Sequence, residues 1–367
     1  MKSTKSNSYR LNSLKKVKSK YVLQQIFDNL ARKKFLEIIR YNKILKKFLN
    51  IRKDAYKEEF AKIEIEIFPK EEEDGKFINI PDNYRKYFHI FCDDNIKEIE
   101  KYDINENDKI SKIKIIIDYK VKTLSGLFFD CQCIEKINFI KFYNYEITKM
   151  DEMFCGCDNL EEINFYKFIT DNVCDMSRMF MECVNLKKLN LSNFNTSKVV
   201  HMTFMFFNCS ALKELNLSNF NTNNVKDMDY MFFACSSLKK LNLSGLGGKY
   251  VTYMSYMFSN CSALKELNLS NFKTNNVTDI SHMFEGCSSL TQLNLSSFNT
   301  AYVKDMSEMF RYCSSLKKLN ISNFKTNDMT KMGGMFNNCS PKKIDCPTRL
   351  KNKIKVQYKN IKEEAFY

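Results

Sequence analysis

The chain is organised around the stretch Leu212-Lys-Glu-Leu-Asn-Leu-Ser-Asn-Phe-Asn-Thr-Asn-Asn-Val-Lys-Asp-Met-Asp-Tyr-Met-Phe-Phe-Ala-Cys235, which recurs with small changes along most of its 367 residues. Counted from the cysteine that opens each 26-residue unit, apolar residues return at +3, +6, +8, +11, +16, +19, +22 and +23. The cysteines are Cys131, Cys157, Cys183, Cys209, Cys235, Cys261, Cys287, Cys313 and Cys339. A fixed period of this length predicts a solenoid, in which each unit buries its apolar face only against its neighbours.

Each unit contains two kinds of local pattern. Apolar and polar residues alternate from +5 to +9, as in Leu189-Asn-Leu191, and this predicts a short strand. Threonine at +13, for example Thr222, suits a helix N-cap, and the apolar steps at +16, +19, +22 and +23 indicate a short helix ending near the cysteine. One strand and one short helix per unit predict an α/β fold, a right-handed leucine-rich-repeat solenoid with a parallel sheet along one face.

The outward residues at +5 support stacking in register. Opposite charges side by side on neighbouring strands are favourable by roughly 0.2 to 1 kcal/mol. The charges largely alternate between units 26 residues apart, in the order Lys188, Glu214, Lys240, Glu266, Gln292 and Lys318.

The regions outside the repeats have their own patterns. We expect a mobile basic arm over residues 1–20, a helical head over 21–61, a linking and capping region of short strands over 62–120, the solenoid over 121–340 and a C-terminal cap over 341–367. The short strands are predicted around Ile63–Ile67, Phe77–Ile80 and Ile113–Ile117. A degenerate first repeat from about residue 105 shields one end of the stack.

The composition argues against catalytic and metal chemistry. Nine of the fourteen cysteines occupy equivalent sites, which predicts a column of buried, reduced thiols rather than disulfides. There is no C-x-x-C pair, and His89, His201 and His282 are scattered, so we expect no metal site. The methionine rows at +19 and +22 fit core filling. No G-x-S-x-G, Gly-rich phosphate loop or H-E-x-x-H occurs, so we expect no enzyme, no cofactor and no small-molecule substrate.

The net charge of +15 is concentrated at the N-terminus, because residues 1–53 carry 12 Lys and 4 Arg against Asp28 and Glu37. This charge indicates that an acidic surface or an adaptor protein binds the head. The alternative interpretation is that the basic residues only form the solvated faces of its helices. The basic residues of the head are Arg32, Lys33, Lys34, Arg40, Lys43, Lys46 and Lys47. No apolar run is long enough for an integral membrane segment or a secretory signal, so we expect an intracellular location.

The unit L-x-x-L-N-L-S-x-F-x-T-x-x-V-x-x-M-x-x-M-F-x-x-C resembles the repeat of the BspA-like leucine-rich repeat proteins over residues 121–340. This resemblance implies a curved, non-catalytic solenoid and adhesion to host or matrix proteins at the cell surface. In the head, Tyr21–Leu30 followed by Phe35–Lys43 is similar to an F-box without its customary Leu-Pro opening. That resemblance implies an adaptor-docking module and a substrate receptor of a ubiquitin ligase.

The outward residues of the strands at +5 and +7 are the candidate interaction residues. They are Lys188, Asn190, Glu214, Asn216, Lys240, Asn242, Glu266, Asn268, Gln292, Asn294, Lys318 and Asn320. The asparagines at +7 form either a hydrogen-bonding strip for a ligand or a ladder of stacked amides. A specific partner needs differentiated contacts, and the units differ mainly at +5, at +12 to +15 and around +20 and +21. The function expected first is a protein-interaction scaffold that uses the strand face and adjoining loops, with the substrate receptor and the adhesin as alternatives.

The inward and outward assignments make a direct prediction. Leu215→Asp should lower the free energy of unfolding by about 3 kcal/mol or more, because it buries an unpaired charge. Glu214→Gln, one residue away on the outward side, should change it by less than about 0.5 kcal/mol. Denaturant unfolding followed by circular dichroism measures both, and equal effects would show that the assignments are wrong.

Overall fold

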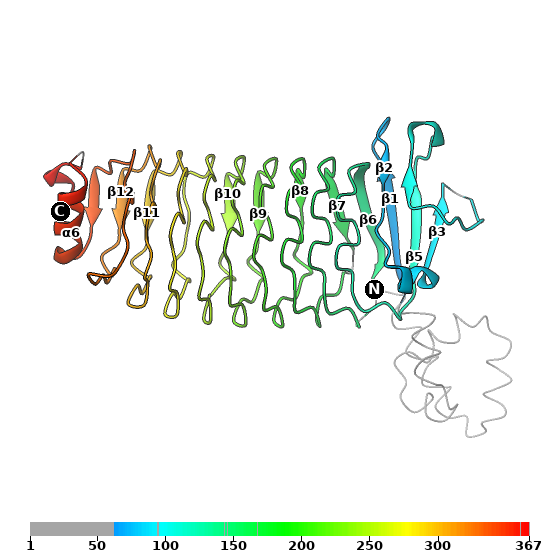
Figure 1. The fold of residues 1–367 in the computed structure, drawn as a ribbon, viewed down its shortest axis with the longest axis horizontal. Helices are drawn as coiled ribbons and strands as arrows, with labels where there is room; N and C mark the ends of the chain where they lie inside the picture. Colours follow the sequence, from blue (N-terminus) through cyan, green and yellow to red (C-terminus); the bar gives the residue numbers. More distant parts are fainter. Residues whose placement is uncertain are drawn as a thin grey trace, which may run out of the picture. The chain divides into compact units, whose positions relative to one another are not determined.

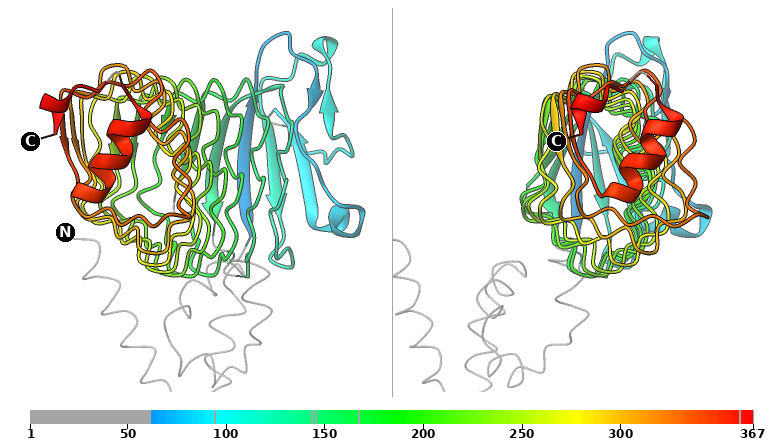
Figure 2. Two further views of the ribbon diagram at one scale, coloured as in Figure 1. Left: turned by 60° about the vertical axis from the view of Figure 1, so that its left-hand side comes forward. Right: turned by 90° about the vertical axis from the view of Figure 1, so that its left-hand side faces the viewer.

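The computed structural model describes residues 62–366, apart from Asp94, Tyr143, Tyr145, Lys167 and Asn360. Residues 63–367 form one compact unit, in which the 26-residue repeats stack as successive rungs (Figure 1). Figure 2 shows the rungs superposed in the view along the stack. The predicted arm, the helical head, its basic residues and the F-box-like stretch Tyr21–Lys43 lie outside the described residues.

Strands are present within the predicted +5 to +9 segment in most units, mainly over +5 to +7, and those that pair do so in register, but Glu266–Asn268 in the unit from Cys261 forms no strand. A parallel run joins β6 (Ile134–Phe142), β7 (Glu162–Phe165) and β8 (Lys188–Leu189), and a second pairs β9 (Glu214–Asn216) with β10 (Lys240–Asn242). A third joins β11 (Gln292–Asn294), β12 (Lys318–Asn320) and β13 (Lys343–Asp345). The predicted charge pairing is confirmed where Lys240 Nζ lies 2.7 Å from Glu214 Oε1.

The predicted helix in each unit is wrong. In the described part of residues 121–340, the segment from +18 to +25 is a chain of tight turns that pairs with the next rung. Phe180 N, for example, donates to Met205 O at 2.9 Å, while the following turn closes locally from Met181 N to Arg178 O at 3.1 Å. The fold is therefore a β-solenoid with few helices rather than a strand-and-helix repeat.

Rung spacing explains this difference. The turn segments of neighbouring rungs also pair directly with one another, so on this side too the rungs lie one strand spacing of about 4.8 Å apart, and an α-helix about 10 Å wide with its side chains has no room there. Residues in the left-handed backbone conformation keep the turn segment of each rung flat. They recur at +21 and +25, as at Arg178 (φ 54°) and Glu182 (φ 61°). The apolar spacing that resembled a helix face is the inward side of these turns.

The predicted core is confirmed, except that Leu189, Leu241 and Leu267 at +6 are only partly buried. All nine column cysteines are fully buried, none of the fourteen cysteines forms a disulfide, and the methionines at +19 and +22 lie in the interior. The thiol of Cys209 donates to Phe180 O at 3.1 Å, and the same contact recurs along the column. Phenylalanines at +23 stack between rungs, as Phe180 and Phe206 do with ring centroids 5.6 Å apart. Burial raises the pKa of the Cys235 and Cys287 thiols to about 12, so these two thiols stay protonated at neutral pH.

The threonines at +13 do not cap helices but join rungs. Thr196 Oγ1 donates to Asn221 O at 3.0 Å and accepts from Asn221 N at 2.7 Å. Thr300 makes the same pair of bonds with Lys325, at 2.9 and 2.6 Å. The preference for threonine reflects a buried hydroxyl that satisfies both main-chain groups of one residue in the next rung.

An antiparallel sheet covers the N-terminal end of the stack. The central strand β1 (Ile63–Pro69) pairs with β6 on one side and with β5 (Ile113–Ile117) on the other, and β3 (Phe88–Cys92) pairs with β5. A small ladder joins β2 (Gly75–Lys76) to β4 (Asp103–Ile104), and two 3-10 turns, η1 (Asp82–Tyr87) and η2 (Glu106–Asp108), complete the region. The strands predicted around 63–67 and 113–117 are confirmed. The one at Phe77–Ile80 is wrong, because that segment is buried but irregular.

The C-terminal end carries the helix α6 (Thr348–Gln357) and the 3-10 turn η3 (Glu363–Ala365). Tyr358, directly after α6, donates its hydroxyl to Met332 O at 3.0 Å and packs edge-on against Phe336. These contacts cover the apolar face of the last rung, as a terminal element of a solenoid must do. None of the helices in the described part of the chain has the length and apolar character needed to cross a bilayer.

The threonine contacts lead to a prediction with an internal control. Thr300→Val should lower the free energy of unfolding by about 1–3 kcal/mol, because Lys325 N and O lose their buried partner. Thr326 occupies the same position in the next unit, but its Oγ1 is buried without a hydrogen-bond partner. Thr326→Val should therefore be neutral or slightly stabilising. Denaturant unfolding of the two variants distinguishes them, and equal losses would contradict the role assigned to this hydroxyl.

Candidate functional site

A groove of about 1030 Å³ runs along the strand face of the central units. It is lined from one rung to the next by the outward residues at +5, +7 and +9, with the leucines at +6 below them. It contains most of the predicted interaction residues, namely Asn190, Glu214, Asn216, Lys240, Asn242, Glu266, Asn268, Gln292 and Asn294. Lys188 lines a neighbouring hollow of about 810 Å³, while Lys318 and Asn320 lie on β12 outside the groove. The predicted basic residues of the head lie outside the described residues.

The asparagines of this face are held by their own rungs. Asn216 Oδ1 accepts from Ser218 N at 3.1 Å, and Asn242 Oδ1 accepts from Ser244 N at 3.1 Å. The same bond recurs at Asn190, Asn268, Asn294 and Asn320. No hydrogen bond joins the side chains of these six residues to one another, so the interpretation as bonded stacked amides does not hold for them, and each oxygen caps a local turn instead. The capping bond fixes each side chain and uses the amide oxygen alone.

The groove lies where the strand ladder is interrupted. Within the described rungs, no backbone hydrogen bond joins Glu266–Asn268 to the strands before or after it. Leu241 and Leu267 are partly exposed there, whereas Leu215 and Leu293 are buried. The floor of the groove is thus apolar between polar walls.

Gly245 lies in the rung before this interruption. Its neighbouring units carry asparagine at the same position, and Asn219 reaches back with its side chain to Phe194 O at 2.8 Å. At Gly245 the backbone itself approaches the preceding rung, since a Cβ there would lie 2.5 Å from Phe220 O. Any larger residue would force the rungs apart.

A second conspicuous surface lies on the turn segment, and the aromatic residues there were not among the predicted site residues. We call it the aromatic patch, and it comprises Phe204, Phe207, Tyr230, Phe233, Tyr256 and His282. Rings at +21 stack face to face along the chain of rungs, with centroids 4.7, 4.6 and 4.2 Å apart. A second column at +24 pairs Phe207 with Phe233 at 4.8 Å. The signal was present in the sequence, because aromatic residues recur at 26-residue intervals at positions where the units differ.

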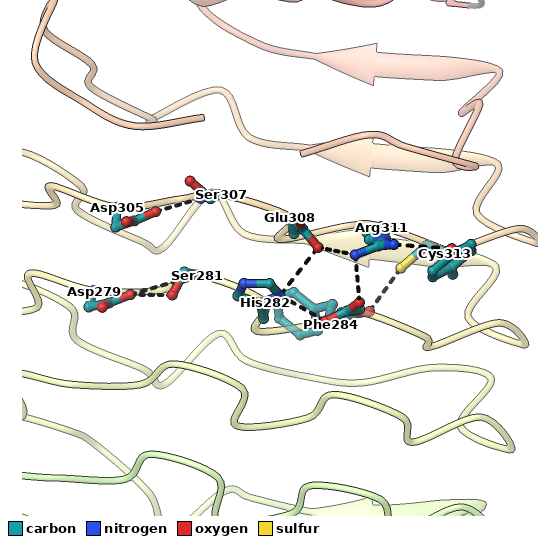
Figure 3. A network of polar contacts seen from close by, with 11 residues as sticks. Asp279, Ser281, His282, Phe284, Asp305, Ser307, Glu308, Arg311 and Cys313 are labelled. Carbon is teal, nitrogen blue, oxygen red and sulfur yellow. Dashed lines mark hydrogen bonds and ion pairs between the residues drawn. The ribbon is translucent and has the colours of Figure 1, made fainter. Parts of the chain in front are cut away.

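The patch ends in the polar network of Figure 3. His282 Nδ1 lies 2.8 Å from Glu285 Oε2 and 3.6 Å from Glu308 Oε2. Arg311 pairs with Glu308 and lies 3.6 Å from Glu285, and the hydrogen bond that its guanidinium donates to Glu308 raises the pKa of Arg311. His282, Glu285 and Glu308 present three atoms of the metal-ligand type within 4.8 Å of one another. Arg311 already supplies a cation to both carboxylates, so the arrangement is that of an ion-pair network.

Carboxylates border the patch on another side. Asp279 Oδ1 accepts from Ser281 N and Oγ at 2.8 and 2.7 Å, and Asp229 Oδ1 accepts from Ser255 N and Oγ at 2.6 and 2.8 Å. Burial, followed by the neighbouring Asp227, raises the pKa of Asp229 to about 6. These side chains therefore have a structural role as caps and also concentrate negative charge beside the rings.

Comparison with protein families finds a matching family model. A family model described as "Mycoplasma protein of unknown function, DUF285" matches residues 122–245 and 241–348. The chain belongs to this family. The two DUF285 matches cover the stacked rungs and the entry into the C-terminal cap, and both the match and the 26-residue rungs are compatible with a BspA-like repeat protein. A search of curated proteins finds no significant match.

Proposed function

We propose that this DUF285 protein is a non-enzymatic binding scaffold that holds a protein partner along the strand-face groove. The observation that carries the proposal is the continuity of the groove, in which one wall pattern repeats over successive rungs. A partner lying along it would meet equivalent groups at each rung step of about 4.8 Å.

The chemistry of the groove suits a polypeptide. Capped asparagines present their amide groups, charges alternate between Glu214, Lys240 and Glu266, and the partly exposed Leu241 and Leu267 offer an apolar floor. Interfaces between proteins combine an apolar centre with a polar rim in this way. Because the rungs already fix these side chains, binding would cost little conformational entropy in the scaffold.

The two alternatives would use the same face. A substrate receptor of a ubiquitin ligase needs a recognition surface in addition to its adaptor-docking head, and an adhesin needs one for its matrix or host protein. Both are therefore specialised forms of the binding scaffold proposed here, with an intracellular location in the first case and the cell surface in the second.

Selection of random peptides displayed on phage against the intact chain tests the proposal. Enriched peptides should bind the Asn216→Ala/Asn242→Ala/Asn268→Ala variant at least about tenfold more weakly than the wild type, a loss of about 1.4 kcal/mol. Asn224→Ala/Asn276→Ala, which changes exposed asparagines at +15, is the matched control and should leave binding unchanged. Peptides that bind all three proteins equally would refute the assignment to the groove.

A further inference from the structure

The aromatic patch is not required by the solenoid fold. Several units carry other residues at one or both of these positions, and they form the same turns. At +21 these include Gly126, Glu152, Arg178, Glu308 and Gly334, and at +24 they include Cys155, Ser259, Glu285, Arg311 and Asn337. Aromatic side chains in consecutive central units therefore call for an explanation other than packing of the core.

The patch presents a partly exposed apolar strip. Its rings lie outside the core, and each ring face at +21 is covered by the ring of the next rung, so the ring edges contact solvent. Contacts between the two columns, such as Tyr230 to Phe233 at 5.7 Å, make the strip continuous across several rungs. Contiguous exposed apolar surface of this kind marks interaction sites, and aromatic residues are enriched at protein interfaces.

The charge beside the strip is negative. Burial raises the pKa of Tyr230, and the carboxylates of Asp229 and Asp279 raise it further. Burial and then Tyr230 raise the pKa of Tyr256, with additional contributions from Glu285, Glu308 and Asp279. The two tyrosine rings thus lie in the field of four carboxylates, of which Glu285 and Glu308 are already paired with Arg311.

The molecule itself shows which group fits the end of the strip. The guanidinium of Arg178 lies 5.5 Å from the ring centroid of Phe204, the first ring of the +21 column, while its NH1 contacts Glu152 at 3.0 Å. Aromatic contact and carboxylate pairing by one cationic side chain are therefore combined at this surface.

We propose that the aromatic patch, with Asp229 and Asp279 beside it, docks an Arg- or Lys-rich amphipathic segment of a protein partner. The alkyl stems of the partner's cations cover the ring edges, and their charged ends reach the two carboxylates. Nucleic acids and acidic peptides are disfavoured by the negative charge at this edge. The surface is separate from the strand-face groove, so this inference does not depend on the function proposed above.

Fluorescence anisotropy with the intact chain tests the proposal. The probes are two labelled peptides of equal length, one of alternating Arg and Leu and the other of alternating Ser and Leu, because an acidic probe would bind the basic residues 1–53. The Arg/Leu probe should bind at least about tenfold more tightly than the Ser/Leu probe. Equal binding of the two probes would overturn the proposal.

Three double variants locate the binding. Phe207→Ser/Phe233→Ser removes the +24 rings and should lower the affinity for the Arg/Leu probe about tenfold. Serine already occurs at this position in another unit, as Ser259. Asp229→Asn/Asp279→Asn removes two charges but keeps in each side chain the oxygen that accepts from Ser255 or Ser281. This variant should lose affinity for the Arg/Leu probe to a similar extent. Glu214→Gln/Glu266→Gln removes as much charge from the groove and should leave binding unchanged.

The pattern of these results is decisive in either direction. Loss of binding in both patch variants but not in the groove variant supports the proposal. Equal weakening by the groove variant would mean nonspecific attraction of the probe to surface carboxylates, and unchanged affinity of the Asp229→Asn/Asp279→Asn variant would rule out a role for these two carboxylates. Either outcome overturns the proposal. Thermal unfolding of each variant verifies that the solenoid is intact.

Discussion

The structure depends on hydrogen bonds that pass from each rung to the next. They occur at the strands, at the turn segment and at the buried threonines, and all of them require that equivalent residues lie one strand spacing apart. This single constraint accounts for the cysteine column, the stacked phenylalanines and the absence of a helix in the described units. In a unit that formed a helix, the backbone N–H groups would bond within the helix and not to the next rung, and the helix would be too wide for the distance between paired rungs.

The same constraint separates two kinds of outward residue. Asparagine at +7 is repeated because it caps a turn in each rung, so its sameness has a structural cause even though it lines the groove. Residues at +21 and +24 are free to vary, since Arg178, Tyr230 and Glu308 occupy equivalent places in equivalent turns. Differences between units at such positions are therefore more informative about recognition than the repeated residues are.

Much of the fold could be predicted from the sequence because burial has a clear periodic signature. The register of Glu214 with Lys240 and the burial of the thiols followed from that period alone. The helix prediction failed because inward residues at steps of three also fit a chain of turns with two left-handed residues four positions apart in each unit, such as Arg178 and Glu182. The groove could not be located in advance, because it depends on the interrupted pairing at Glu266–Asn268. The His282 network was missed because its partner Glu308 lies one full unit away in sequence.

Counting reactive thiols in the native protein tests the central claim of in-register burial most directly. The account predicts that a small aromatic disulfide reagent reacts quickly only with the partly exposed Cys92, Cys174 and Cys346, and with all fourteen cysteines after denaturation. Mass spectrometry of the labelled peptides identifies the sites. Rapid labelling of most of the nine column cysteines in the native protein would contradict the account, because their thiols would then lie outside the stacked core.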